Sequence, residues 1–154
     1  ESYPDTLSGE EIPVFIACEK ADAYRQTMHS DELIITADTI VWLDGLVMGK
    51  PEDEEDARRM LRCLSGKTHQ VITGVCLTTT EFQKSFATVT DVTFAELTEE
   101  EIDYYVQKYK PMDKAGSYGI QEWIGFVGVE GITGSYFNVM GLPIQRLYKE
   151  LKKL

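Results

Sequence analysis

One acidic residue, Asp38, interrupts the apolar stretch LIITADTIVWLDGLVMGKP. A buried carboxylate costs free energy unless it is paired or hydrogen-bonded, so Asp38 calls for an explanation. Thr39 follows it directly, Lys50 lies near the end of the same stretch, and Asp113 with Lys114 leads into the glycine-rich AGSYGIQ. A carboxylate in a partly apolar cleft can hold a divalent ion or accept a proton from water, and a nearby lysine can neutralise phosphate oxygens. Together these residue types favour phosphoryl chemistry on an anionic substrate.

Each of these side chains also has a purely structural interpretation. Asp38 can cap a neighbouring backbone amide, and Lys50 can be a solvated turn residue. The acidic run PEDEED that begins at Pro51 could gather a metal ion, but acids are common in the first turn of a helix, which is the interpretation we favour. The segment from Gly45 to Lys50 is one residue short of a GxxxxGK phosphate loop, and Pro51 stands where that loop needs Ser or Thr.

A β-hairpin is expected to hold Asp38 and Lys50. The run from Leu33 to Leu43 is rich in Ile, Val and Thr, which is typical of a strand buried on at least one face. Asp44-Gly45 is a favoured two-residue hairpin turn. The return strand should end at Gly49-Lys50-Pro51, because proline cannot donate to a strand ladder.

The remaining elements follow from periodicity and from start and stop signals. We expect helices from about Pro13 to Met28, through PEDEEDARRMLRCLSG, from Thr98 to Pro111 and from Pro143 onward. We expect antiparallel neighbouring strands from His69 to Thr80 and from Ser85 to Phe94. The segment from Asp113 to Ile144 holds seven of the 12 glycines. Glycine lets a backbone approach a ligand closely or turn sharply, so this segment is either a second part of the site or a set of hairpin turns.

Composition indicates one soluble globular domain, with 154 residues, 43% hydrophobic and 27% charged. The 15 basic and 26 acidic residues give a net charge of −11, which argues against broad contact with nucleic acid or an anionic membrane. No apolar run reaches the roughly 20 residues of a membrane helix, and we expect no signal peptide. Three cysteines without CxxC spacing are expected to be reduced thiols in a cytosol, so we expect a cytoplasmic protein. With only His29 and His69, the sequence favours neither a zinc site nor a nucleophilic triad.

Four stretches of the chain resemble one known family. The sequences ADTIVWLDGLVMGKP, ARRMLRCLSGKTHQVITGV and DKAGSYGIQ with GSYFNVMGLP are similar to those of the Maf family of nucleoside triphosphate pyrophosphatases, from about Glu1 to Pro143. The resemblance implies an α/β fold of the inosine triphosphatase type, with a bent mixed central sheet, helices on both sides and two lobes around a cleft. It also implies hydrolysis of a nucleoside triphosphate to the monophosphate and pyrophosphate with a divalent cation, Mg²⁺ or alternatively Mn²⁺ or Co²⁺.

The resemblance assigns the phosphate half of the site residue by residue. Asp38 corresponds to the acid or base that acts on the attacking water, and is also an expected metal ligand. Lys50 in GKP and Lys20 in the first helix correspond to lysines of the family's site. Glu1, ahead of Ser2, resembles an acidic metal ligand of the family's early loop.

The resemblance also assigns the base half. Thr39 and Gln121 match positions connected with base specificity. The KAGSYGIQ form is similar to the branch that acts on dTTP and UTP, with modified pyrimidine nucleotides as further candidates. An amide suits pyrimidine recognition, because it donates and accepts at a single base edge. The family also leads us to expect a homodimer with a small-molecule nucleotide as its partner.

The start of the sequence departs from the family pattern. Family members open with a strand and a Ser-rich, Arg-Arg phosphate loop, and this sequence begins just after the place where that loop should end, at Glu1 and without a Met. We therefore expect residues 1–154 to be a single pyrophosphatase domain that lacks this strand and loop, and we expect little activity from this exact polypeptide. Equal rates of dTTP hydrolysis by this chain and by an N-terminally extended one would contradict that expectation.

Two alternatives remain open from the sequence. One is a non-catalytic interaction protein of cell division, to which the family's association with septum formation points. The other is a purine-directed relative that hydrolyses inosine or xanthosine triphosphate. Pyrophosphate release measured across the common triphosphates, with and without Mg²⁺, separates these possibilities.

Overall fold

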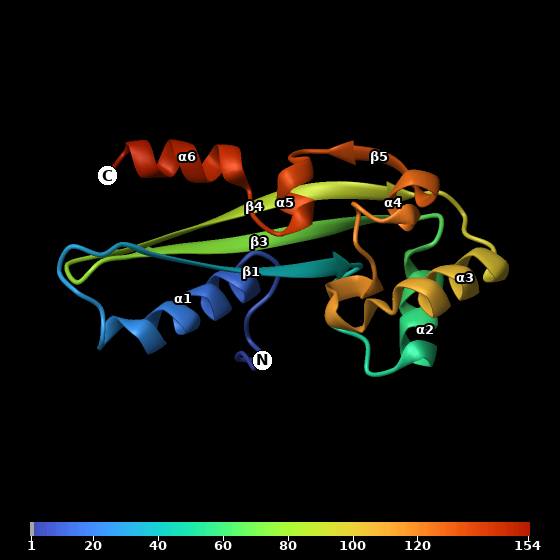
Figure 1. Ribbon diagram of the computed structural model, residues 1–154, viewed down its shortest axis with the longest axis horizontal. Coiled ribbons are helices and arrows are strands. Elements are labelled where there is room, and N and C mark those ends of the chain that lie inside the picture. Colours follow the sequence, from blue (N-terminus) through green and yellow to red (C-terminus); the bar gives the residue numbers. More distant parts are fainter. Residues whose placement is uncertain (1) are drawn as a thin grey trace.

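A five-stranded antiparallel sheet forms the centre of the computed structural model, which describes residues 2–154 (Figure 1). The strands are β1 (Ile34–Leu43), β2 (Leu46–Met48), β3 (Thr68–Thr78), β4 (Gln83–Phe94) and β5 (Val129–Thr133). Their order across the sheet is β2-β1-β3-β4-β5, so the central strand is β3.

Helices lie on both sides of this sheet and at one end of it. They are α1 (Glu11–Arg25), α2 (Glu54–Leu64), α3 (Glu99–Tyr109), α4 (Trp123–Gly128), α5 (Tyr136–Met140) and α6 (Ile144–Lys152), with the 3-10 turns η1 (Pro111–Asp113) and η2 (Ala115–Ser117). Figure 1 shows α1 below the long strands, α5 and α6 above them, and α2 with α3 at the right-hand end. No helix in the described part of the chain is long and apolar enough to cross a membrane.

The expected β1–β2 hairpin is confirmed. Asp44 (φ 50°) and Gly45 (φ 81°) form its two-residue turn, and positive φ at both positions matches the twist of the flanking strands. The short β2 pairs only with the end of β1, where Val41 lies opposite Met48. Because the chain leaves the sheet after Met48, Lys50 lies just beyond the hairpin.

Helix starts follow the local signals that the sequence contains. Asp53 caps α2 by accepting a hydrogen bond from the Asp56 N–H at 2.7 Å. Thr98 and Glu101 form the expected capping box of α3, with hydrogen bonds of 2.8 and 3.1 Å. Within residues 2–154, no group of three or more His, Cys, Asp or Glu side chains could hold a metal ion. The acidic run supplies the N-cap of α2, Asp53, and the acidic residues of its first turn, Glu54, Glu55 and Asp56.

Helix α1 packs directly on the sheet because Gly74 of β3 leaves room for it. A Cβ atom at Gly74 would lie 2.3 Å from the backbone nitrogen of Val14 and 2.4 Å from the carbonyl carbon of Pro13. Gly74 lies opposite Asp38 in the β1–β3 register. The first turn of α1 therefore approaches the sheet beside Asp38.

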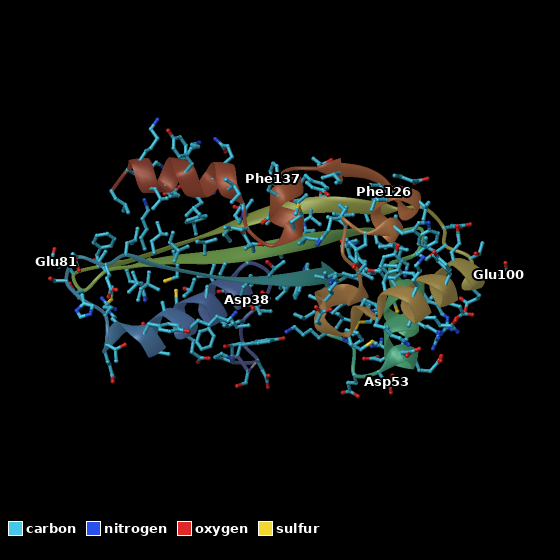
Figure 2. The ribbon with its side chains drawn as sticks, viewed as in Figure 1. Asp38, Asp53, Glu81, Glu100, Phe126 and Phe137 are labelled. Carbon is cyan, nitrogen blue, oxygen red and sulfur yellow. The ribbon has the colours of Figure 1, made fainter. Side chains whose placement is uncertain are left out.

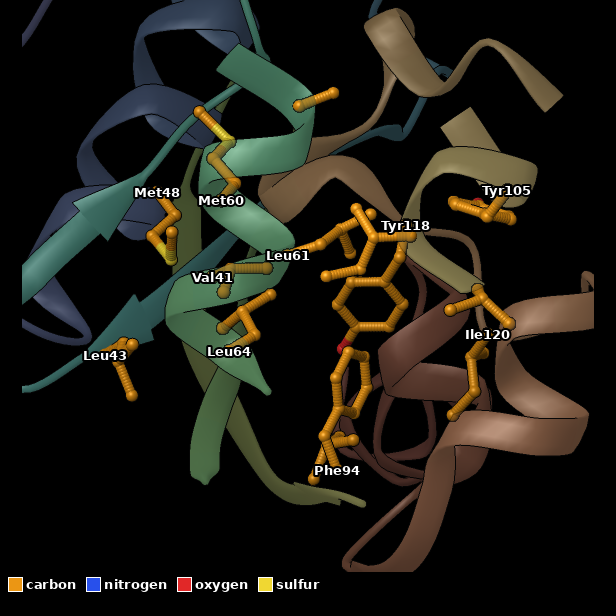
Figure 3. Close-up of a cluster of buried hydrophobic side chains, with 14 of the residues drawn as sticks. Val41, Leu43, Met48, Met60, Leu61, Leu64, Phe94, Tyr105, Tyr118 and Ile120 are labelled. Atoms are coloured by element: carbon orange, nitrogen blue, oxygen red, sulfur yellow. The ribbon is translucent and has the colours of Figure 1, made fainter. Parts of the chain in front are cut away.

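The largest apolar cluster joins α2 and α3 to the strands (Figure 3). Its fully buried side chains include Leu61, Leu64, Ile102 and Tyr105. Tyr118 packs edge-on against Phe94, with ring centroids 4.9 Å apart, and Ile120 belongs to the same cluster. The core therefore anchors the segment that leads to Gln121.

The α/β class and the flanking helices are confirmed. We expected a mixed sheet, but all four pairings within residues 2–154 are antiparallel. Antiparallel neighbours need only short links, as between β1 and β2 and between β3 and β4. The glycine-rich segment does not form hairpins; it folds into η2, α4, the edge strand β5 and α5.

Candidate functional site

Asp38 and Lys20 form an ion pair on the side of the sheet that faces α1 (Figure 2). Lys20 Nζ lies 3.3 Å from Asp38 Oδ1 and donates to the carbonyl oxygen of Ala37 at 3.2 Å. The Asp38 side chain is 13% exposed and that of Lys20 is 40% exposed. Water screens a half-buried pair less than a surface pair, so the attraction between the two groups is stronger here. The fold thus places an acid and a cation in direct contact at a position that a ligand can reach.

Thr39 projects from the opposite face of β1, because successive side chains of a strand alternate. Its Oγ1 lies 2.8 Å from Thr73 Oγ1 and 3.4 Å from the carbonyl oxygen of Gly141. Thr73 Oγ1 in turn lies 3.3 Å from the carbonyl oxygen of Asn138 in α5. These contacts hold the end of α5 over Thr39.

Two hollows adjoin these residues and share Thr39, Lys50 and Ala115. The first, here called the Gln121 hollow, has a volume of about 340 Å³ and is lined by Gln121 and by the end of α5. The second, here called the Asp38 hollow, has a volume of about 530 Å³ and is lined by Asp38 together with residues of α1 and β2. A ligand that occupied both hollows would pass Lys50 and would meet Asp38 at one end and Gln121 at the other.

A backbone hydrogen bond ties the two segments that border both hollows. The Gly116 N–H donates to the carbonyl oxygen of Gly49 at 3.1 Å, next to the exposed Lys50. Gly116 has φ 70°, and a Cβ atom there would lie 2.7 Å from Val41 Cγ2. Only glycine satisfies both conditions, so the AGSYGIQ segment needs this residue to reach the hairpin.

Tyr118 connects the lining of the Gln121 hollow to the central strand. Its hydroxyl oxygen lies 2.6 Å from Nε2 of His69, and both side chains are buried. Burial lowers the pKa of His69 to about 4 and raises the pKa of Tyr118 above its ordinary value. His69 is therefore neutral at neutral pH, and this pair is a structural support rather than an acid–base pair.

The structure brings the predicted site residues together in two groups. Lys20 contacts Asp38, and Thr39, Lys50 and Gln121 line the Gln121 hollow. The Asp38 hollow is lined by Asp38, Thr39 and Lys50. Lys20 does not line it but contacts Asp38.

Among the described residues that line the Asp38 hollow, Asp38 is the one that offers a metal ion a carboxylate. Glu1, the other expected metal ligand, lies outside the described residues. Mg²⁺ is commonly held by one or two carboxylates, with substrate phosphates and water completing its shell. This donor set fits an ion that arrives with a phosphate-bearing ligand, rather than one held in a preformed protein cage.

Other lining residues had weaker signals in the sequence. Lys114 lines the Gln121 hollow, and its Nζ lies 3.5 Å from Asp113 Oδ1 and 4.0 Å from Glu122 Oε2. The sequence groups Asp113 and Lys114 with the residues that favour phosphoryl chemistry, but the family resemblance assigns neither of them a specific role. Gly141 contributes a carbonyl oxygen near Thr39. Every residue has a backbone carbonyl group, so the sequence could not indicate this acceptor.

Several known proteins similar to this chain are named dTTP/UTP pyrophosphatase. A family model described as Maf-like protein matches residues 1–154. The chain is 79% identical to a dTTP/UTP pyrophosphatase of Phocaeicola vulgatus, 72% identical to one of Bacteroides fragilis and 69% identical to one of Bacteroides thetaiotaomicron. Each alignment spans 154 residues, which is 100% of this chain and 80% of the relative.

Proposed function

Because the chain belongs to the Maf-like protein family, we propose that it hydrolyses dTTP and UTP to the nucleoside monophosphate and pyrophosphate. Modified pyrimidine nucleotides are further candidate substrates. The observation that carries this proposal is the pair of hollows that meet at Thr39 and Lys50, with Asp38 at one end and Gln121 at the other. A nucleotide needs both kinds of site, because its phosphates require cations and its base requires hydrogen-bonding groups.

The phosphate half of the nucleotide would occupy the Asp38 hollow. Lys50 and Lys20 supply positive charge there, which a protein with a net charge of −11 must concentrate locally to hold a polyanion. As Asp38 accepts a proton from the attacking water, the water oxygen forms a new bond to one of the two phosphorus atoms of the α–β anhydride, and the bond from that phosphorus to the bridging oxygen breaks. The electron pair of that bond leaves with the oxygen of the departing group.

The base would occupy the Gln121 hollow. Uracil and thymine present a carbonyl oxygen beside an N–H group, and one glutamine amide can donate to the first and accept from the second. Thr39, which also lines this hollow, adds a hydroxyl group. We assign base recognition to these two residues.

A divalent cation, Mg²⁺ or alternatively Mn²⁺ or Co²⁺, is part of the proposal. When bound, it supplies positive charge against the phosphate oxygens. Asp38 is the described residue that would hold it, and we assign Glu1 as a second ligand. Chelation of the ion should therefore stop pyrophosphate release.

We also propose that residues 1–154 act as one pyrophosphatase domain, as a homodimer, in the cytoplasm. One sheet with apolar clusters on both sides supports a single domain. Analytical ultracentrifugation tests the dimer, since a monomer at micromolar concentration would contradict it.

A nucleotide panel tests the function. Purified protein that contains this chain is incubated with dTTP, UTP, CTP, ATP, GTP, ITP and XTP, with Mg²⁺ and with EDTA, and pyrophosphate release is measured. We expect the highest kcat/KM for dTTP and UTP, and no release in EDTA. A preference for ITP or XTP would instead support the purine-directed alternative, and no release from any nucleotide would support a non-catalytic protein.

A further inference from the structure

The hydroxyl group of Tyr105 in α3 bridges both ends of one tight turn. It accepts a hydrogen bond from the Gly119 N–H at 3.1 Å and donates to Oε1 of Glu122 at 2.5 Å. The Tyr105 side chain is fully buried in the main apolar cluster. We call this arrangement, made by Tyr105, Gly119 and Glu122, the Tyr105–Glu122 clamp.

The clamped turn is the one that presents Gln121. Its ends are joined by a hydrogen bond from the Glu122 N–H to the carbonyl oxygen of Gly119 at 3.0 Å. Between them, Ile120 is buried in the core, while Gln121 is exposed and lines the Gln121 hollow. Within residues 2–154, the Gln121 amide makes no hydrogen bond to another side chain, so the turn alone sets its position.

Close packing around the turn also restricts its conformation. A Cβ atom at Gly119 would lie 2.8 Å from Cε of Lys114, and one at Gly125 would lie 1.8 Å from the carbonyl oxygen of Ile120. The second carboxylate oxygen of Glu122 lies 4.0 Å from Lys114 Nζ. The same carboxylate therefore restrains Lys114, another residue that lines the Gln121 hollow.

The protonation state of Tyr105 favours the clamp. Burial is the largest cause that raises its pKa above the ordinary value, and the hydrogen bond to Glu122 raises it further. The hydroxyl group therefore keeps its proton at neutral pH, and it remains a donor to the carboxylate.

We propose that Tyr105 and Glu122 are positioning residues that determine recognition of the base, by holding Gln121 and Lys114 in the geometry that a pyrimidine nucleotide requires. This inference rests on the proposed function, because it takes the Gln121 hollow as the base site. Neither residue touches the phosphate half of the site. The loss of the clamp should therefore weaken the interactions with the base and leave those with the phosphates unchanged.

Tyr105→Phe removes the hydroxyl group and keeps the packing of the ring. It leaves the Gly119 N–H without its acceptor and the Glu122 carboxylate without its donor, so the turn loosens. Displacement of a recognition group reduces binding steeply, and we expect KM for UTP and dTTP to rise about tenfold while kcat falls by less. The inhibition constant of inorganic pyrophosphate, which has no base, should stay within about twofold of the wild-type value.

Tyr109→Phe is the matched control. Tyr109 stacks on Tyr105 in the same helix, with ring centroids 5.0 Å apart, and its hydroxyl group makes no hydrogen bond within the described residues. We expect wild-type KM values from this variant. Glu122→Ala, which removes the other half of the clamp, should raise KM as Tyr105→Phe does, and the double variant should be no worse than the more severe single variant, because one unit is lost.

The outcomes separate this inference from the proposed function. An unchanged KM for UTP in Tyr105→Phe, or an equal rise in KM and in the pyrophosphate inhibition constant, would overturn the clamp even if the wild type is a pyrophosphatase. If the wild type releases no pyrophosphate, the proposed function fails. The clamp can then be tested by calorimetry, because its loss should weaken the binding of UTP and leave the binding of pyrophosphate unchanged in the same variants. A wild type that does not bind UTP would overturn both.

Discussion

Asp38 and Thr39 are neighbours in the chain, yet their side chains face opposite sides of β1. Both residues line the Asp38 hollow, and Thr39 also lines the Gln121 hollow. Asp38 contacts Lys20 on the α1 side, and Thr39 contacts Thr73 and the carbonyl oxygen of Gly141 on the other side. The alternation of side chains along a strand produces this division without any additional element. In our proposal, the acid that acts on water and the hydroxyl group that faces the base are thereby kept apart by the thickness of the strand.

His69 makes the stability of the protein depend on pH. Its pKa is lowered from 6.5 to about 4, because burial disfavours the imidazolium form. The unfolded chain binds a proton at a higher pH than the folded chain does. The contribution of neutral His69 to stability is therefore fully present above pH 6.5 and is lost as the pH falls from about 6.5 to about 4. The shift corresponds to about 3 kcal/mol at the lower end of this range.

His69→Phe should remove this dependence of stability on pH. At pH 7 the variant should be less stable by about 1 kcal/mol, since the Tyr118 hydroxyl group loses its hydrogen-bond partner. As the pH falls towards 4.5, the wild type should lose stability relative to the variant until the order is inverted. Urea unfolding at pH 7, 6, 5 and 4.5 measures both proteins, and a difference that stays constant with pH would refute the role of burial.

At the scale of the elements, the contact between α1 and β3 sets the position of Lys20. Gly74→Ala would place a methyl group 2.3 Å from the backbone of Val14, so α1 must move away from the sheet. We expect a loss of about 1–3 kcal/mol in the free energy of unfolding, as in other overpacked sites, and a lower kcat/KM because Lys20 moves away from Asp38. Thermal unfolding and UTP hydrolysis measure the two effects.

Gly131→Ala in β5 is the control for this substitution. A Cβ atom at Gly131 meets nothing within 4 Å, so this variant should be as stable as the wild type or slightly more stable. If Gly74→Ala and Gly131→Ala had the same unfolding temperature and the same rate of UTP hydrolysis, the close approach of α1 to Gly74 would not be needed for stability or activity.

The elements that the sequence predicted well are those with local signals. The β1–β2 hairpin follows from Asp44-Gly45, and α3 follows from the capping box of Thr98 and Glu101. The short helices after Asp113 could not be predicted in this way. Their conformation depends on tertiary contacts, such as the fit of Gly116 against Val41, which no local pattern contains.

The same distinction applies to the site across the whole molecule. Asp38 could be found because a charge in an apolar run is conspicuous, and the roles of Lys20, Thr39, Lys50 and Gln121 came from the family resemblance. Tyr105 could not be found, because at its position in the helix it has the same pattern as a core aromatic residue. Its hydroxyl contacts to Gly119 and Glu122 are formed only when α3 and the glycine-rich segment meet.

The molecule as a whole brings residues from distant parts of the chain to one strand. Lys20 comes from α1, Lys50 follows the hairpin, and Gln121 lies in the glycine-rich segment, yet each of them lies near β1. Our central claim is that Asp38, at the middle of this strand, acts on the water that cleaves the nucleotide. Its removal should therefore affect turnover more than nucleotide binding.

The most direct test is the turnover of Asp38→Asn with UTP and Mg²⁺, measured as pyrophosphate release in the protein that contains this chain. Asn keeps the size of the side chain but cannot accept the proton, so we predict that kcat falls by roughly 10²–10⁴-fold or more, with a similar melting temperature. Asp44→Asn, at the exposed turn of the same hairpin, should keep the wild-type kcat. Turnover by Asp38→Asn at the wild-type rate would contradict the claim.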